Sequence, residues 1–237
     1  MFGMSKFKLA SVLAGLLALV VGCVTVGPNT TMGPPRILAM GDSMMSWNGG
    51  GGNSIPEVIA NELSQPVMSR AVSGAHVIYS LPITGSAGLK ISSQYVKGDW
   101  DWVVLNGGGN DLWLGCNCDN CEARMNKMIS QDGAQGVIPS NVAKLRATGA
   151  QVIYLGYLRS PGVGSIIEHC RDDGDELERR LARMAQGMNG VHFLSVARMV
   201  PSGDRSFHAV DMIHPSVKAS HEIGKRAAAV MRQASAE

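Results

Sequence analysis

Short runs of consecutive hydrophobic residues alternate along this chain with segments in which hydrophobic residues return every three or four positions. The first pattern is typical of strands buried on both faces of a sheet, and the second of amphipathic helices. The strands that the pattern predicts are residues 36–40, 66–72, 102–106, 151–155 and 191–195. The helices that it predicts are residues 54–65, 142–148, 175–188 and 216–233.

The order of these elements indicates a parallel sheet, because parallel strands need a crossover connection that is usually a helix. Right-handed crossovers then place helices on both faces of the sheet. We therefore expect an α/β fold, a three-layer α/β/α sandwich with a five-stranded, flavodoxin-like parallel sheet. No internal repeat is visible, so residues 36–237 are expected to form one domain.

Local signals mark the ends of two predicted helices. Ser54 is a good N-cap, Pro56 suits the first turn, and Glu57 stands at the capping-box position. Gly149 follows the helix over residues 142–148, where a glycine C-cap is common.

The first 22 residues have a different composition and predict an export signal. Lys6 and Lys8 precede a hydrophobic run over residues 9–22, which is shorter than the ~20 residues that span a bilayer. The run ends in Val-Val-Gly-Cys at residues 20–23, which resembles the lipobox of bacterial lipoproteins. That resemblance implies lipidation at Cys23. Residues 23–35 contain Gly-Pro and Gly-Pro-Pro and no core-forming pattern, so we expect a tether there. An ordinary signal peptide or an uncleaved anchor helix is the alternative.

Composition and charge narrow the class of protein further. With 45% hydrophobic and 17% charged residues in 237, the chain can form a core and is not expected to be disordered. The formal net charge is +2, but removing residues 1–22 would remove Lys6 and Lys8 and leave 19 basic against 19 acidic residues. A neutral domain attracts polyanions weakly, so we expect no nucleic-acid partner.

Four cysteines remain besides Cys23, and an even number in an exported chain favours disulfides. Cys116 and Cys118 are too close in sequence to be expected to pair with each other, so one of them is expected to reach Cys170. The alternative is a zinc site, because Cys-x-Cys-x-x-Cys with a fourth cysteine can surround that metal. The candidates are Cys116, Cys118, Cys121 and Cys170.

Small and polar residues cluster where the predicted strands end, which is where parallel α/β sheets bind ligands. Gly41-Asp42-Ser43 follows the first strand, Ser73-Gly74 the second, and Gly108-Gly109-Asn110-Asp111 the third, and Asp211-Met212-Ile213-His214 precedes the last helix. In this order the four clusters resemble the sequence blocks of the SGNH (GDSL-type) hydrolases. The resemblance covers roughly residues 36–230.

The residue chemistry agrees with the roles that this resemblance implies. A serine hydroxyl becomes a useful nucleophile when an imidazole accepts its proton, so Ser43 is the expected nucleophile and His214 its base. Asp211 can bind the other ring nitrogen and fix the tautomer. The N–H groups of Ser43 and Gly74 and the Asn110 amide are the expected oxyanion hole. No metal and no cofactor are required.

Other polar and aromatic residues near these blocks have expected roles outside the reaction. Asp42 and Asp111 are predicted to hydrogen-bond loop backbone. Trp47 and Trp113 either line an acyl or sugar pocket or belong to the core. The cysteine-rich segment after Asn110 is expected to lie beside the cleft, where a disulfide to Cys170 would form a rigid wall near Ser43.

The sequence therefore predicts a serine esterase that hydrolyses carboxylic esters, with acyl or O-acetyl groups, through an acyl-enzyme. Its expected partners are a small-molecule or polysaccharide ester and, through the N-terminal lipid, a membrane. The expected location is the bacterial cell envelope, facing the periplasm or exterior. A thioesterase-lipase, an acyltransferase, or a non-catalytic glycan-binding or scaffold lipoprotein on the same fold are the alternatives.

Overall fold

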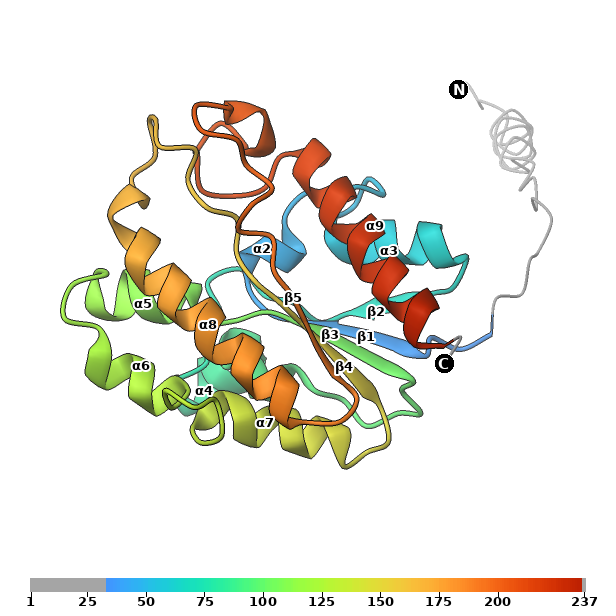
Figure 1. The fold of residues 1–237 in the computed structure, drawn as a ribbon. Helices are drawn as coiled ribbons and strands as arrows, with labels where there is room; N and C mark the ends of the chain where they lie inside the picture. The colour runs from blue at the N-terminus through green and yellow to red at the C-terminus, as the bar shows by residue number, and fades with distance from the viewer. Residues whose placement is uncertain (1–32, 236–237) are drawn as a thin grey trace, which may run out of the picture. The chain divides into compact units, whose positions relative to one another are not determined.

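A sheet of five parallel strands in the order β2-β1-β3-β4-β5 forms the centre of the structure, a computed structural model that describes residues 33–235 (Figure 1). The predicted signal segment and Cys23 lie outside the described residues. The strands are β1 (Ile37–Met40), β2 (Val67–Ser69), β3 (Trp102–Leu105), β4 (Gln151–Leu155) and β5 (Val191–Leu194). The predicted fold class is confirmed.

Helices cover both faces of this sheet, as Figure 1 shows. The helices α2 (Ser43–Ser46), α3 (Ile55–Leu63) and α9 (Val217–Ala234) lie on one side. The opposite side carries α5 (Gly109–Cys116), α6 (Glu122–Met128), α7 (Val137–Arg146) and α8 (Arg171–Gly187), and the short α4 (Pro82–Thr84) lies near its edge. The result is three layers.

Alternate residues of each central strand supply the two hydrophobic cores. In β1, Ile37 and Ala39 join the core beneath α3 and α9, whereas Leu38 and Met40 join the core beneath α6, α7 and α8. This follows from the period of two in a strand, which sends neighbouring side chains to opposite faces. A strand buried on both faces is hydrophobic throughout, so these strands could be predicted from the sequence.

The strand register brings the polar clusters to one edge of the sheet. Met40 pairs with Leu105, and Leu105 pairs with Tyr154, so β1, β3 and β4 end almost level. Residues that follow these strands therefore meet in space although they are far apart in the sequence. This is the edge that carries the candidate site.

Several predicted boundaries need correction. β2 ends at Ser69, not at residue 72, and most of it is exposed at the sheet edge. α7 begins five residues earlier than predicted because Pro139 is accommodated in the first turn. α8 begins at Arg171, where Asp172 and Asp173 complement the positive end of the helix dipole.

The helix-end signals had mixed outcomes. Ser54 and Glu57 form the predicted capping box of α3, each side chain bonding to the other residue's backbone N–H. Gly149 is not the C-cap of α7: Ala147 holds that place, and Gly149 follows two residues later with φ +96°.

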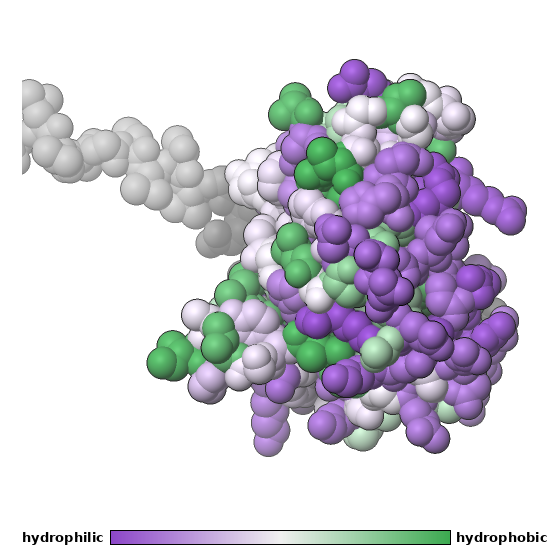
Figure 2. Space-filling view, turned by 90° about the vertical axis from the view of Figure 1, so that its left-hand side faces the viewer, coloured by the Kyte–Doolittle hydropathy of each residue, from purple (hydrophilic) through white to green (hydrophobic). Residues whose placement is uncertain are grey.

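The outer surface is mixed in character. Figure 2 shows a face covered largely by hydrophilic side chains, with hydrophobic ones in small groups among them. Within residues 33–235, no helix is long and hydrophobic enough to cross a membrane.

Candidate active site

Ser43 is the first residue of α2, directly after the turn that ends β1. Gly41 has a φ of +139°, and a Cβ atom there would lie 1.9 Å from Oδ1 of Asn106, so this turn requires glycine. Asp42 is the N-cap of α2 and accepts a hydrogen bond from the N–H of Met44 at 3.0 Å. Ser43 therefore opens a short helix that Asp42 caps.

The Asp42 carboxylate is a structural anchor beside the candidate nucleophile. Its Oδ1 accepts from Nδ2 of Asn106 at 2.8 Å, and its Oδ2 accepts from the hydroxyl of Tyr157 at 2.5 Å. Burial raises the pKa of Asp42, and these hydrogen bonds oppose that rise. Asp42 was predicted to bond to loop backbone; the backbone group that it binds is instead the N–H of Met44 in α2. The sequence did not show that Asn106 and Tyr157 also hold it.

His214 and Asp211 form the hydrogen-bonded pair that the sequence predicted. Nδ1 of His214 lies 2.6 Å from Oδ2 of Asp211. The other carboxylate oxygen accepts from the N–H groups of Ile213 and His214, both at 3.0 Å. Partial burial raises the pKa of Asp211, but the bonds from the His214 ring and these N–H groups outweigh it and hold the pKa below its ordinary value.

Ser43 and His214 border the same cavity. Among the described residues, neither Oγ of Ser43 nor Nε2 of His214 has a hydrogen-bond partner, so both atoms are free to engage a substrate. Hydrogen bonds of a catalytic pair are often long without substrate and shorten when it binds.

Asn110 and Gly74 lie on two segments that are tied to each other. Nδ2 of Asn110 donates to the carbonyl of Ala75 at 2.9 Å, which leaves its second hydrogen for another acceptor. The turn that contains Gly74 is closed by the N–H of Ala75 bonding to the carbonyl of Val72 at 3.1 Å. Gly74 has φ +78°, and a Cβ there would meet only Leu89, at 4.0 Å. Backbone conformation is thus a sufficient reason for glycine at this position.

The turn over residues 72–75 also contacts the Ser43 segment. The N–H of Val72 donates to the carbonyl of Gly41 at 3.0 Å, and the hydroxyls of Ser46 and Ser73 lie 2.9 Å apart. Within residues 33–235, the backbone N–H groups of Ser43 and Gly74 have no acceptor. Ser43 and Asn110 line the cavity and Gly74 does not, so a part for Gly74 in the oxyanion hole stays a prediction.

Asp111 does not line the cavity; its side chain binds the backbone of a neighbouring segment. Its two carboxylate oxygens accept from the N–H groups of Val77 at 2.8 Å and Ile78 at 2.9 Å. Burial raises the pKa of Asp111, and these two bonds oppose the rise. The predicted backbone-binding role of Asp111 is confirmed, and it fixes the start of α5, which carries Asn110.

The two tryptophans near the blocks have different positions. Trp113 lines the cavity. Trp47 does not line it and belongs to neither hydrophobic core; its indole stacks on the imidazole of His214. The sequence predicted either a pocket or a core position for each tryptophan. The stack of Trp47 on His214 was not predicted, because the two residues are far apart in the chain.

The cavity beside Ser43 has a volume of about 110 Å³. Much of its wall is hydrophobic, with Leu112, Leu158, Ile167, Leu177 and the Cys118–Cys170 disulfide. Polar groups on the wall include Arg159, Glu168 and Arg171.

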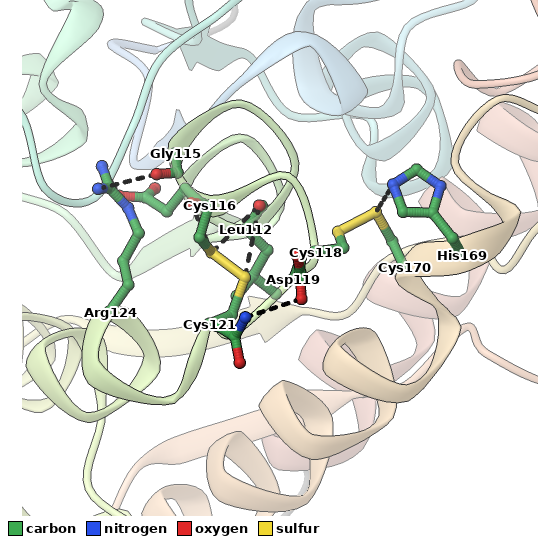
Figure 3. Close-up of a disulfide and its surroundings, with 11 residues drawn as sticks. Leu112, Gly115, Cys116, Cys118, Asp119, Cys121, Arg124, His169 and Cys170 are labelled. Carbon is green, nitrogen blue, oxygen red and sulfur yellow. Dashed lines mark hydrogen bonds and ion pairs between the residues drawn. A yellow bond between two sulfur atoms is a disulfide. The ribbon is translucent and has the colours of Figure 1, made fainter.

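All four described cysteines are in disulfides, as Figure 3 shows. Cys116 pairs with Cys121, and Cys118 pairs with Cys170 across 52 residues. The predicted link to Cys170 and the preference for disulfides over zinc are confirmed. His169 lies beside Cys118 and Cys170, but both sulfurs are already bonded to each other. The long-range bond connects the segment after α5 to the start of α8, and it borders the cavity as predicted.

Ser43 and the Asp211–His214 pair follow strands of a parallel sheet on the side where α/β folds bind ligands, the arrangement expected of a hydrolase. The sequence pattern of the GDSL-like Lipase/Acylhydrolase family matches residues 39–221, and the chain belongs to this family. A search of curated proteins found no match.

Solved structures share the fold. An SGNH-type protein from Slackia heliotrinireducens is 20% identical, with a TM-score of 0.58, over 84% of this chain and 100% of that one. A catalytic mutant of an acetylxylan esterase from Geobacillus stearothermophilus is 18% identical, with a TM-score of 0.58, over 83% and 93%. The inhibitor-bound aryl esterase of M. smegmatis is 16% identical, with a TM-score of 0.57, over 84% and 99%.

Proposed function

We propose that the protein is a serine esterase that removes short acyl groups, such as acetyl, from hydroxyl groups of its substrate. The observation that carries this proposal is that His214, joined to Asp211 at 2.6 Å, lies on the wall of the cavity that Ser43 and Asn110 also border. Family membership supports ester hydrolysis in general.

In the first half of the reaction, Oγ of Ser43 attacks the ester carbonyl carbon while Nε2 of His214 accepts the hydroxyl proton. Asp211 holds Nδ1 and stabilises the imidazolium that results. Negative charge on the former carbonyl oxygen is stabilised by the free donors of Ser43, Gly74 and Asn110. When the carbon–oxygen bond of the ester breaks, His214 returns the proton to the departing alcohol, leaving the acyl group on Ser43.

In the second half, water replaces the alcohol. His214 accepts a proton from the water as its oxygen attacks the acyl carbon, and the same three donors stabilise the second tetrahedral intermediate. Breaking the bond to Oγ returns the proton to Ser43 and releases the carboxylic acid. The residues named suffice for each proton transfer.

The size of the cavity supports a short acyl group. Its volume of about 110 Å³ is small beside the ~300–1,000 Å³ of sites that enclose drug-sized ligands. An acetyl or butyryl group fits such a space. We propose that the alcohol part of the substrate lies outside it.

Two observations support a carbohydrate as that alcohol part. Structures with the same fold include an acetylxylan esterase from Geobacillus stearothermophilus and a family two carbohydrate esterase from Clostridium thermocellum in complex with cellohexaose. Trp113 also offers an aromatic ring on the cavity wall. We propose an O-acetylated saccharide as the substrate class.

We place this activity in the bacterial envelope, with the protein lipidated at Cys23. The support is the export-signal pattern of residues 1–23 together with two disulfides, which persist in oxidising compartments. Expression with labelled palmitate tests the anchor: the wild type is expected to take up label and Cys23→Ser to take up none. Equal labelling, or none in either protein, would contradict lipidation at Cys23.

The activity is tested with p-nitrophenyl acetate, butyrate and octanoate. We expect kcat/KM at least tenfold higher for the acetate and butyrate than for the octanoate, and no turnover by Ser43→Ala. A fluorophosphonate should label the wild type and the matched control Ser46→Ala, but not Ser43→Ala. Asn110→Ala should lower kcat by about 10²–10³, as expected when one oxyanion donor is lost.

The same experiment separates the alternatives. Binding of an acetylated saccharide without turnover of any ester, unchanged by His214→Ala, would show a glycan-binding protein on this fold. Transfer of the acetyl group to an added alcohol in preference to water would show an acyltransferase. Octanoate as the best substrate would overturn the short-chain assignment and leave the esterase assignment intact.

A further inference from the structure

Trp47 forms a face-to-face stack with the histidine of the candidate site. The centroids of the indole and imidazole rings are 3.8 Å apart, and the ring planes are inclined by 7°. Trp47 is the C-cap of α2, and its N–H donates to the carbonyl of Ser43 at 2.8 Å. One short helix therefore carries Ser43 at its first position and the ring that covers His214 just beyond its last.

Hydrogen bonds also hold together the backbone segments that follow the two stacked residues. Nδ2 of Asn48, the residue after Trp47, donates at 3.0 Å to the carbonyl of Pro215, the residue after His214. The same amide donates to Oγ of Ser220 in α9 at 3.0 Å. The stack is thus part of a junction between two segments that lie more than 160 residues apart in the sequence.

Packing alone does not explain a tryptophan at this position. Two other tryptophans, Trp100 and Trp102, are buried and belong to the hydrophobic cores, whereas Trp47 is only partly buried and belongs to neither. It does not border the cavity either, so it is not placed to contact the acyl group. Its principal ring contact is the imidazole of His214.

We infer that Trp47 is a positioning residue for His214, an inference that rests on the proposed function. The bond to Asp211 lies in the plane of the imidazole and restricts its rotation within that plane. The indole lies against the face of the imidazole and restricts its tilt out of that plane. The indole face also attracts a cation, which favours the imidazolium that forms when Ser43 gives up its proton. Trp47 acts through His214 and does not touch the substrate.

The test compares Trp47→Leu and Trp47→Phe with the wild type on p-nitrophenyl acetate. For Trp47→Leu we expect kcat to fall about 3- to 30-fold with KM unchanged, the range that a cation–aromatic contact gives. Trp47→Phe keeps an aromatic face and should recover most of the loss. Thermal unfolding of both variants verifies that they fold.

A spectroscopic readout tests the stack without any turnover. In the Ser43→Ala background, the ring protons of His214 should have NMR signals shifted upfield by the indole ring current. The shift should be lost in Trp47→Leu and partly kept in Trp47→Phe. If the wild type hydrolyses no ester while the shift is present, the proposed function fails and the stack itself is confirmed.

Trp113→Leu is the matched control, because Trp113 lines the cavity and is not stacked on His214. It should change KM or the preference among acyl groups and leave the His214 signals in place. An unchanged kcat in Trp47→Leu, or a fall in kcat that Trp47→Phe does not recover, would overturn the inference. So would a Trp47→Leu enzyme that differs from the wild type in KM alone.

Discussion

The hydroxyl of Tyr157, just beyond β4, donates to Oδ2 of Asp42, just beyond β1, at 2.5 Å. These residues are 115 positions apart, and their bond joins the ends of two strands directly beside Ser43. Burial, followed by the nearby Asp42 charge, raises the pKa of Tyr157 well above its ordinary value, so the phenol is a neutral donor across the physiological range. Asp42 thereby keeps a hydrogen-bond partner on each oxygen.

Tyr157→Phe should destabilise the protein because it leaves Oδ2 of Asp42 buried without a donor. We expect a loss of about 1–3 kcal/mol in the free energy of unfolding, measured with urea, and a fall in kcat as the Ser43 segment loosens. Tyr154→Phe is the control. That hydroxyl is also buried, but it donates to the neutral carbonyl of Gly107 at 3.0 Å. Its loss should be smaller, and equal losses would contradict the special role of the Asp42 contact.

Asp211→Asn should lower kcat by a factor on the order of 10³–10⁴, because an amide holds the wrong tautomer of His214.

The same variant should change how the free energy of unfolding depends on pH. The folded-state pKa of Asp211 lies below its ordinary value, so its ionised form stabilises the fold above about pH 4, and this contribution is lost as the pH falls through the folded-state pKa.

Urea unfolding of the wild type and Asp211→Asn from pH 7 to pH 3 measures this contribution. The difference between the two proteins should be largest near neutral pH and should shrink in acid. A difference that grows as the pH falls would show that the ionised carboxylate does not stabilise the fold.

Gly41→Ala and Gly74→Ala should have unequal effects although both glycines have positive φ. At residue 41 the added methyl group would lie 1.9 Å from Oδ1 of Asn106, and we expect a loss of about 3 kcal/mol or more with the Asp42–Asn106 contact broken. At residue 74 only Leu89 lies within 4.0 Å, so backbone strain of about 1 kcal/mol remains. Thermal or urea unfolding compares them, and a larger loss at residue 74 would contradict the geometry.

The two disulfides should contribute differently to stability. Cys118–Cys170 closes a sequence separation of 52 and Cys116–Cys121 one of 5. On the chain-entropy account, removing the first should cost about 4 kcal/mol and removing the second about 2 kcal/mol. Paired Cys→Ser variants measured by urea unfolding test this.

Only the long-range bond borders the cavity on both of its cysteines. Cys118→Ser/Cys170→Ser should therefore also lower activity on short esters, and added zinc should not restore it. Cys116→Ser/Cys121→Ser serves as the control for loss of a nearby disulfide. Equal activity losses would show that the cavity wall does not depend on Cys118–Cys170.

The sequence predicted the sheet well because its central strands are buried on both faces. The run over residues 151–155 matches β4 at both ends, since a continuous hydrophobic run has few alternatives in an α/β pattern. The helices α5 and α6 were not predicted. Their segment contains Gly, Asn, Asp and three cysteines, a composition typical of turns, and the disulfides and the Asp111 bonds to backbone outweigh that preference.

The sequence also predicted which residues meet at the candidate site, because polar residues after parallel strands gather at one edge. Asp211 and His214 are three positions apart in the sequence, so their contact could be predicted from that spacing. The contacts that hold the site residues in place could not be predicted. Tyr157 with Asp42, Asn106 with Asp42, and Trp47 with His214 depend on how strand ends align across the sheet, which no local pattern records.

The bond between Asn48 and Pro215 joins an early part of the chain to a late one, so it can form only after most of the chain has been synthesised. Ser43 is synthesised before β2, β3, β4 and β5, whereas Asp211 and His214 follow all five strands. At about 5–20 residues per second, His214 is added roughly 10–30 s after Ser43. On the proposed function, Ser43 is an ordinary alcohol throughout that interval. We therefore expect the translating ribosome to carry an unreactive serine, with reactivity arising only when the last segment folds onto the first.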